Sequence, residues 1–207
     1  MVDTQIRPSD VTKYPIIDAM LGVAREEFVP ANRREAAYVG ENLSVGANRV
    51  ILEPRTLAKM LDALDIAQDE LVLDIAPAFG YSSAVIANLA AAVVALEEDA
   101  DFAREAQEAL TAAGADNVIV QEGPLSAGAQ EHGPYDVIVV QGGVSTVPEA
   151  VIAQLKDGGR IAALFMDGAV GEVRLGYKVD GQMSWRLSFN AGAPVLPGFE
   201  NELQFTL

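Results

Sequence analysis

Short apolar runs alternate with amphipathic stretches through the middle of the chain. Each run is rich in aliphatic residues, as buried strands are; the runs are residues 71–76, 92–97, 117–121, 135–141 and 159–165. Apolar residues at helical spacing lie between them, at 82–90, 99–113 and 148–155. The second of these stretches stops before Gly114, a residue typical of the position after a helix end. This alternation predicts an α/β fold with a doubly wound, mostly parallel sheet covered on both faces.

The two flanks differ from this alternating core. Before the core, helical periodicity at 16–23 and 56–64 surrounds a β-branched segment at 42–53, which predicts a helical cap with a short strand or extended loop. After the core, we expect antiparallel strands at 171–179 and 183–190, a Pro/Gly turn at 194–198 and a final short strand at 203–205. We therefore expect one domain, with a cap at 1–65, a core at 66–165 and antiparallel strands at 166–207.

The composition indicates a globular protein of the cytoplasm. Half of the 207 residues are hydrophobic and 21% are charged, so the chain can bury a substantial core. The absence of cysteine excludes disulfides, thiolate nucleophiles and Cys-ligated metals, and it is compatible with a reducing compartment. The N-terminus lacks the apolar segment of a signal peptide, and no apolar stretch reaches the roughly 20 residues of a membrane helix. We expect no membrane partner.

The net charge argues against nucleic acid as a partner. The chain has 14 basic and 30 acidic side chains, which gives a formal charge of −16. Phosphate backbones attract Lys and Arg, and here acids outnumber them about two to one. No pattern in the sequence indicates an oligomeric state.

The segment LVLDIAPAFGY at 71–81 is the most informative for function. A buried strand ends near Asp74, small residues follow at Ala76, Ala78 and Gly80, and a helix begins at Tyr81 or the next residue. In nucleotide-binding α/β folds, small residues in this first strand-to-helix turn let a ligand approach the backbone. The alternative is a tight turn that binds nothing.

Glu97 ends the next apolar run, roughly 20 residues after the turn. An acid at this position can accept hydrogen bonds from both ribose hydroxyls of a nucleotide. Glu98 and Asp99 follow directly, and such an acidic cluster also serves to cap a helix. We assign the ribose role to Glu97 because it ends the strand.

Most of the chain resembles the protein-L-isoaspartate O-methyltransferase family, whose members are class I methyltransferases that use S-adenosylmethionine. The resemblance extends over about residues 15–165 and is strongest in AMLGVAREEFVP at 19–30, AAYVGENLSVG at 36–46, VILEPRTLAKML at 50–61, VLDIAPAFGYSSAVIANL at 72–89 and VVALEED at 93–99. It implies a Rossmann-like methyltransferase that repairs isoaspartyl residues in proteins or peptides. It further implies cofactor contacts at Asp74, Ala76, Ala78, Gly80, Tyr81, Glu97 and Gly123, and no metal.

The chain departs from the family pattern in three motifs. The family usually has Thr-Ile-Ser-Gln-Pro where this chain has VILEP at 50–54, so Leu52 replaces the serine with an active-site role and no catalytic residue is assigned. The family turn usually holds three glycines, of which only Gly80 is present. Alanine can replace glycine in such a turn if its φ is negative, and on that condition cofactor binding survives the substitutions. Gly-Asp-Gly near the adenine becomes Gly123-Pro124-Leu125.

Other candidates have simpler explanations. His132 lies in a polar loop, where a solvated side chain is more common than a catalytic base. Four acids would form a metal site or acidic pair only if the cap joined them, and a solvated face is the simpler expectation; they are Glu26, Glu27, Glu41 and Glu53. Ser126 and Ser145 lack a nucleophile-elbow pattern. We expect cross-strand packing for the C-terminal aromatics, which are Tyr177, Trp185, Phe189, Phe199 and Phe205.

Two functions remain open from the sequence. A sulfonium methyl group is already activated, and a carboxylate acceptor needs no general base, so an O-methyltransferase needs chiefly to align its reactants and exclude water. The continuous resemblance favours such an enzyme. The substitutions in three motifs favour a noncatalytic binding or regulatory module that keeps the fold.

Overall fold

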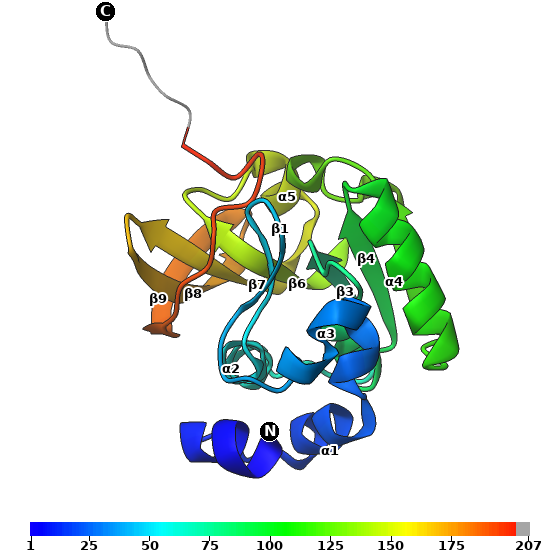
Figure 1. Cartoon of the computed structure of the whole chain (residues 1–207). Helices are drawn as coiled ribbons and strands as arrows, with labels where there is room; N and C mark the ends of the chain where they lie inside the picture. Colours follow the sequence, from blue (N-terminus) through cyan, green and yellow to red (C-terminus); the bar gives the residue numbers. More distant parts are fainter. Residues whose placement is uncertain (202–207) are drawn as a thin grey trace, which may run out of the picture.

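One seven-stranded sheet, in the order β5-β4-β3-β6-β7-β8-β9, forms the centre of the molecule (Figure 1). The computed structural model describes residues 1–201. The strands are β3 (Leu71–Ile75), β4 (Ala92–Glu97), β5 (Val118–Glu122), β6 (Tyr135–Val144), β7 (Leu155–Asp167), β8 (Val170–Val179) and β9 (Gln182–Asn190). The first five are parallel, and β8 and β9 continue the sheet as antiparallel strands. The predicted fold class is confirmed.

Helices cover both faces of the sheet. The α-helices are α1 (Tyr14–Gly22), α2 (Pro54–Leu64), α3 (Tyr81–Ala87), α4 (Ala100–Ala112) and α5 (Glu149–Ala153). Short helical turns are η1 (Val2–Ile6), η2 (Arg7–Ser9), η3 (Arg25–Phe28), η4 (Ala31–Ala36), η5 (Leu125–Ala127) and η6 (Gln130–His132). One core cluster joins α1 to α4 with one face of the sheet, and a second joins η5, α5 and the segment 196–199 with the other.

Side chains alternate between these two clusters along the central strands. On β3, Val72 belongs to the first cluster, whereas Leu73 and Ile75 belong to the second. On β6, the same alternation separates Val137 from Ile138. The period of two follows from the pleat, and continuous apolar runs result because both faces are buried.

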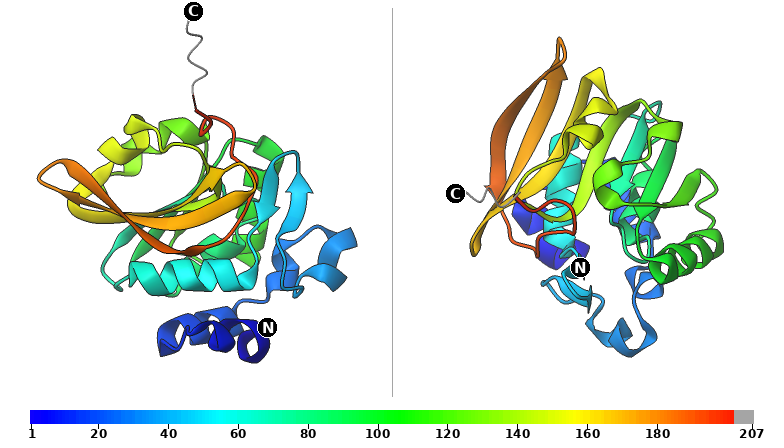
Figure 2. Two further views of the ribbon diagram at one scale, coloured as in Figure 1. Left: turned by 90° about the vertical axis from the view of Figure 1, so that its left-hand side faces the viewer. Right: turned by 90° about the horizontal axis from the view of Figure 1, so that it is seen from above.

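The first part of the chain forms a cap against α2 and α3 (Figure 2). It contains a separate two-stranded hairpin of β1 (Leu43–Gly46) and β2 (Arg49–Ile51). The sequence predicted a single strand or extended loop here; the chain instead turns back at Asn48, which adopts a left-handed φ of 55°. Asparagine tolerates this conformation better than most residues, so the hairpin has a local cause.

The carboxyl end of β3 is the switch point of the sheet. From β3 the chain continues to β4 and β5 on one side, and it then crosses to β6 on the other side of β3. Helices therefore leave this edge in opposite directions and open a crevice at the strand ends, where ligands of α/β folds bind. The strand-to-helix turn at 76–80 lies here.

The C-terminal predictions have mixed outcomes. Strands β8 and β9 match the predicted antiparallel pair, and Trp185 packs edge-to-face on Phe165 of β7 at 4.9 Å between ring centroids. The expectation for Phe199 is wrong: it is buried in the second cluster from a loop, where its carbonyl accepts hydrogen bonds from the N–H groups of Ser145 and Thr146. The strand predicted at 203–205 lies outside the described residues. Within residues 1–201, no helix has the length and apolarity to cross a membrane.

Candidate cofactor and active site

Asp74 connects three elements at the carboxyl edge of the sheet. Its Oδ2 accepts hydrogen bonds from the hydroxyls of Ser82 (2.6 Å) and Ser83 (2.7 Å) on α3, and its Oδ1 accepts one from Gln141 Nε2 (2.7 Å) on β6. The carboxyl group is fully buried, and this burial raises the pKa of Asp74 to about 6 despite the three donors. Asp74 thereby fixes the start of α3 relative to β3 and β6.

The turn after β3 has the positive φ angles typical of glycine at two positions that are occupied by alanine. Ala76 has φ of 66° and Ala78 has φ of 54°, and both are completely buried. The negative φ that would let alanine replace glycine easily is therefore absent at both positions. Left-handed backbone disfavours an L residue by about 1–2 kcal/mol, so the surrounding structure imposes this shape. At Gly80, with φ of 89°, a Cβ would lie 3.1 Å from Leu110 of α4, which explains why this glycine remains.

Glu97 is the last residue of β4, and its carboxylate is completely buried. Arg49, the first residue of β2, forms a two-pronged ion pair with it: Nη1 donates to Oε2 at 2.9 Å, and Nη2 donates to Oε1. The N–H of Ala78 also donates to Oε1, at 2.6 Å. Burial raises the pKa of Glu97, and the donors from Arg49 and Ala78 offset part of this rise.

The three successive acids at 97–99 have different environments, which distinguishes their roles. Asp99 caps α4, because its side chain accepts hydrogen bonds from the N–H groups of Asp101 and Phe102. Glu98 is exposed. Gly123, after β5, donates its N–H to the carbonyl of Glu97 at 2.8 Å, so it lies beside the end of β4.

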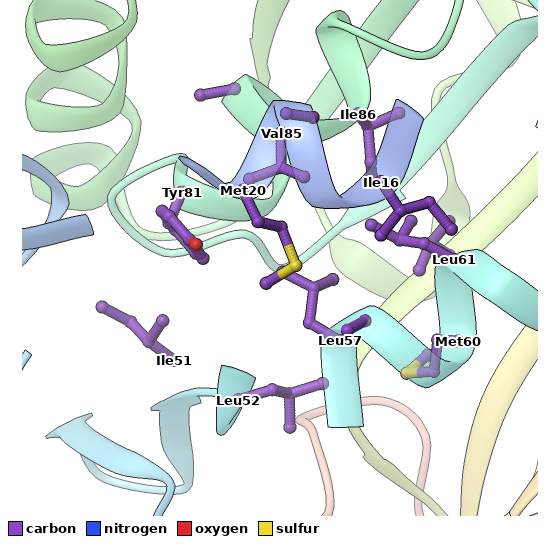
Figure 3. Close-up of a cluster of buried hydrophobic side chains, with 14 of the residues drawn as sticks. Ile16, Met20, Ile51, Leu52, Leu57, Met60, Leu61, Tyr81, Val85 and Ile86 are labelled. Atoms are coloured by element: carbon purple, nitrogen blue, oxygen red, sulfur yellow. The ribbon is translucent and has the colours of Figure 1, made fainter. Parts of the chain in front are cut away.

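Tyr81 and Leu52, the residue after β2, belong to one apolar cluster with residues of α1 and α2 (Figure 3). The guanidinium of Arg25 lies 4.6 Å from the centre of the Tyr81 ring and donates to the carbonyls of Leu52 (2.8 Å) and Ala37 (2.7 Å). Arg25 therefore fixes the backbone at the position where the family has its serine. Leu52 itself is buried, with 2% of its surface exposed.

A small cavity marks the space between the hairpin and the turn. Its volume is about 10 Å³, which is room for about one water molecule. Its lining joins the hairpin segment, α2, the turn, α3 and β6; the residues are Val50, Ile51, Leu52, Leu57, Pro77, Tyr81, Ser82 and Gln141. The predicted turn, Tyr81 and the family's serine position thus meet at one place.

The other candidates do not join this site. Glu26 bonds Tyr38, Glu27 pairs with Arg34, and Glu53 bonds Thr56, so these acids have separate partners. In residues 1–201, no cluster of three or more potential ligand side chains could hold a metal ion. His132 precedes β6 and therefore lies at the opposite, amino edge of the parallel strands.

Sequence reasoning missed Arg49 and Arg25. Arg25 belongs to the segment AMLGVAREEFVP at 19–30, which contributed only to the family resemblance. Arg49 opens the apolar run VIL at 50–52. A charged residue that begins a buried run needs a buried partner, and Glu97 was an acid without one. This pairing was a detectable signal.

The doubly wound sheet, the strand-to-helix turn at its switch point and the buried acid at the end of β4 define a Rossmann-like methyltransferase. The chain belongs to the protein-L-isoaspartate(D-aspartate) O-methyltransferase family, whose model matches residues 1–168. This is a family of S-adenosylmethionine-dependent enzymes.

Individual relatives agree with this assignment. The chain is 38% identical over 161 residues to a protein-L-isoaspartate O-methyltransferase of Methylorubrum populi, and the match covers 78% of this chain and 76% of that protein. The enzyme of the same name from Syntrophus aciditrophicus is also 38% identical, with 74% of its length covered. A solved protein-L-isoaspartate O-methyltransferase superposes with a TM-score of 0.81 at 25% identity, covering 94% of this chain and 65% of that one. A Plasmodium falciparum structure described as a protein of this kind, in complex with S-adenosyl-L-homocysteine, shows the same fold with a TM-score of 0.79.

The arrangement of this chain does not fit the family's cofactor as it stands. A ribose diol needs the oxygens of the acid at the end of β4, and here both oxygens of Glu97 bond Arg49 while Oε1 also bonds the Ala78 N–H. The adjoining cavity is about 10 Å³. The ribose of a bound nucleoside would need the Glu97 oxygens that Arg49 now bonds, so binding there requires Arg49 to leave Glu97.

Proposed function

We propose that this chain transfers a methyl group from S-adenosylmethionine to carboxylates of isoaspartyl residues in proteins or peptides. The observation that carries the proposal is the family match over residues 1–168, which includes every motif at the carboxyl edge of the sheet. Homologues named as O-methyltransferases favour an enzyme over the noncatalytic alternative.

We assign the cofactor contacts to the residues gathered at the switch point. Glu97 would bind the ribose once Arg49 leaves it, and Gly123 would approach the base. The turn and the residues at its ends would flank the methionine moiety; these are Asp74, Ala76, Ala78, Gly80 and Tyr81. The buried position of all five supports the assignment, since a water-free wall excludes hydrolysis and aligns the reactants.

The acceptor site rests on backbone geometry rather than a catalytic hydroxyl. A carboxylate nucleophile needs no base, which agrees with a site that contains Asp74 and Glu97 but no His or Lys among its lining residues. The Leu52 backbone, which Arg25 fixes, would position the acceptor carboxylate at the place of the family's serine. One missing side-chain hydrogen bond lowers a rate by roughly one to two decades.

The proposal extends to location and partners. A cysteine-free chain with a charge of −16 suits the cytoplasm and repels nucleic acid, so damaged proteins and peptides are the proposed partners. We propose that the cap, core and antiparallel strands act together as one domain.

Methyl transfer to a matched peptide pair tests the function. The chain is incubated with saturating radiolabelled S-adenosylmethionine and either an isoaspartyl peptide or the same sequence with ordinary aspartate. We expect an alkali-labile methyl ester on the isoaspartyl peptide alone. Equal labelling of both peptides would contradict the substrate assignment, and labelling of neither would contradict isoaspartyl methylation.

A further inference from the structure

The Arg49–Glu97 pair occupies the groups that a nucleoside would need. The planar guanidinium presents two parallel N–H donors to the two carboxylate oxygens, which is the same donor count that a ribose diol offers. Arg49 is 5% exposed and Glu97 is not exposed at all. The chain thus supplies an internal ligand to its own candidate ribose acid.

From this geometry we propose that Arg49 closes the cofactor site by binding Glu97, and that the β1–β2 hairpin must lift Arg49 away before S-adenosylmethionine or its product can bind. The inference rests on the proposed function. It makes Arg49 a competitor of the cofactor and the hairpin a gate over the switch point.

The tip of the hairpin can move while its base stays in the core, where Leu43, Val50 and Ile51 are buried. The hairpin is a separate two-stranded sheet that does not join the seven central strands. Residues 46–48 at its tip are exposed, whereas Arg49 directly after them is buried. Beyond the ion pair, the tip touches α4 through Phe102, whose ring lies 5.3 Å from the Arg49 guanidinium carbon. Few contacts therefore hold the tip except those of Arg49.

The Arg49–Glu97 ion pair also leaves one buried donor without a hydrogen bond, which is energetically unfavourable. Arg49 Nε is buried and has no hydrogen-bond partner. Removing two charges from water is unfavourable, and the attraction between them compensates fully only when every polar atom is satisfied. An unsatisfied donor in this pair therefore makes the closed state easier to leave, as a gate requires.

Replacing Arg49 is expected to strengthen binding rather than weaken it. If most molecules are closed, the apparent affinity for the cofactor equals the affinity of the open state multiplied by the fraction of molecules that are open. Arg49→Gln removes the competing charge and keeps a side chain that can still donate to Glu97. We expect this variant to bind S-adenosylhomocysteine at least tenfold more tightly than the unaltered chain in calorimetric titration.

Three further measurements make the test decisive. Arg34→Gln removes an exposed arginine that pairs with Glu27, and it serves as the charge-matched control with unchanged affinity. Hydrogen exchange of residues 43–51 reads the gate directly: we expect faster exchange in Arg49→Gln than in the unaltered chain before ligand is added. Thermal unfolding checks that each variant is folded, and Arg49→Met, which also removes the charge, replaces Arg49→Gln if the latter is not.

The outcomes separate this proposal from the proposed function. A folded Arg49 variant that binds no more tightly than the unaltered chain overturns the gate, while methylation of the isoaspartyl peptide by the unaltered chain would still support the enzyme. Binding by neither the unaltered chain nor any folded Arg49 variant overturns both. Tighter binding by the variant together with faster exchange in 43–51 supports the gate.

Discussion

Glu97 on β4 and Asp74 on β3 are both buried at the carboxyl edge of the sheet, but they have different hydrogen-bond partners. Glu97 bonds a cation that the hairpin brings to it, whereas Asp74 bonds neutral donors from its own sheet and helix. The difference gives each a separate test. Glu97 is tested by ligand affinity, and Asp74 is tested by the pH dependence of stability.

Glu97 should matter for ligand binding once the competing arginine is absent. In the Arg49→Gln background, we expect Glu97→Gln to weaken S-adenosylhomocysteine binding tenfold or more, because charge-assisted hydrogen bonds contribute about 1.5–3 kcal/mol. Glu98→Gln in the same background removes an exposed neighbouring acid and should leave the affinity unchanged. Calorimetry compares the two, and equal affinities would remove the ribose role from Glu97.

Asp74 should make the protein less stable as pH rises through its titration. Its pKa is about 6 in the folded chain and near 3.8 unfolded, so its favourable contribution is complete below pH 3.8 and is lost as pH rises to 6. The difference corresponds to about 3 kcal/mol. We expect Asp74→Asn to lose this dependence in urea unfolding between pH 4 and 6.5. Asp69→Asn, at an exposed position, is the control; an unaltered pH profile in Asp74→Asn would contradict the assignment.

At the scale of elements, the sequence predicted what local pattern determines. The strands of the core and α1, α2 and α4 follow from periodicity, and Gly114, with φ of 70°, follows α4 as expected. Two features depended on tertiary structure instead. The positive φ of Ala76 and Ala78 contradicts their intrinsic preference, and the Arg49–Glu97 pair joins residues 48 positions apart. No local pattern encodes either feature. The ion pair did have a sequence signal, because Arg49 and Glu97 each adjoin a buried apolar run and therefore need a partner.

The turn should tolerate glycine unusually well. In Ala78→Gly, relief of about 1–2 kcal/mol of backbone strain offsets the lost methyl group and the added freedom of the unfolded chain. We expect its unfolding free energy to stay within about 1 kcal/mol of the unaltered chain. Ala84→Gly removes an equally buried methyl from the interior of α3, where it should destabilise by about 2 kcal/mol in the same urea titration. Equal losses in both variants would refute strain at Ala78.

The hairpin segment should limit turnover through the missing hydroxyls. Val50→Thr with Leu52→Ser restores the family pair and should raise turnover on an isoaspartyl peptide by one to two orders of magnitude at saturating cofactor. Replacing buried Leu52 should also lower stability by roughly 1.5–3 kcal/mol, so thermal unfolding is measured first. Val50→Thr alone is the control. A folded, ligand-binding double variant that stays inactive would argue for a different acceptor.

At the scale of the whole molecule, the family and the sheet were predictable, but the state of the site was not. The alternating pattern and the motifs at 72–99 led to the doubly wound sheet and to the family, and both are confirmed. Whether a site is open depends on how the cap meets the core. Here the ion pair between Arg49 of the cap and Glu97 of the core decides it, and these residues lie 48 positions apart in the chain.

A crystal structure of the intact chain grown with S-adenosylhomocysteine tests this account most directly. We predict ligand density against residues 76–80 at the carboxyl end of β3, with the ribose hydroxyls on Glu97 and the Arg49 guanidinium moved out of hydrogen-bonding distance. Ligand density elsewhere, or ligand bound at the turn while Arg49 still bonds Glu97, would contradict it.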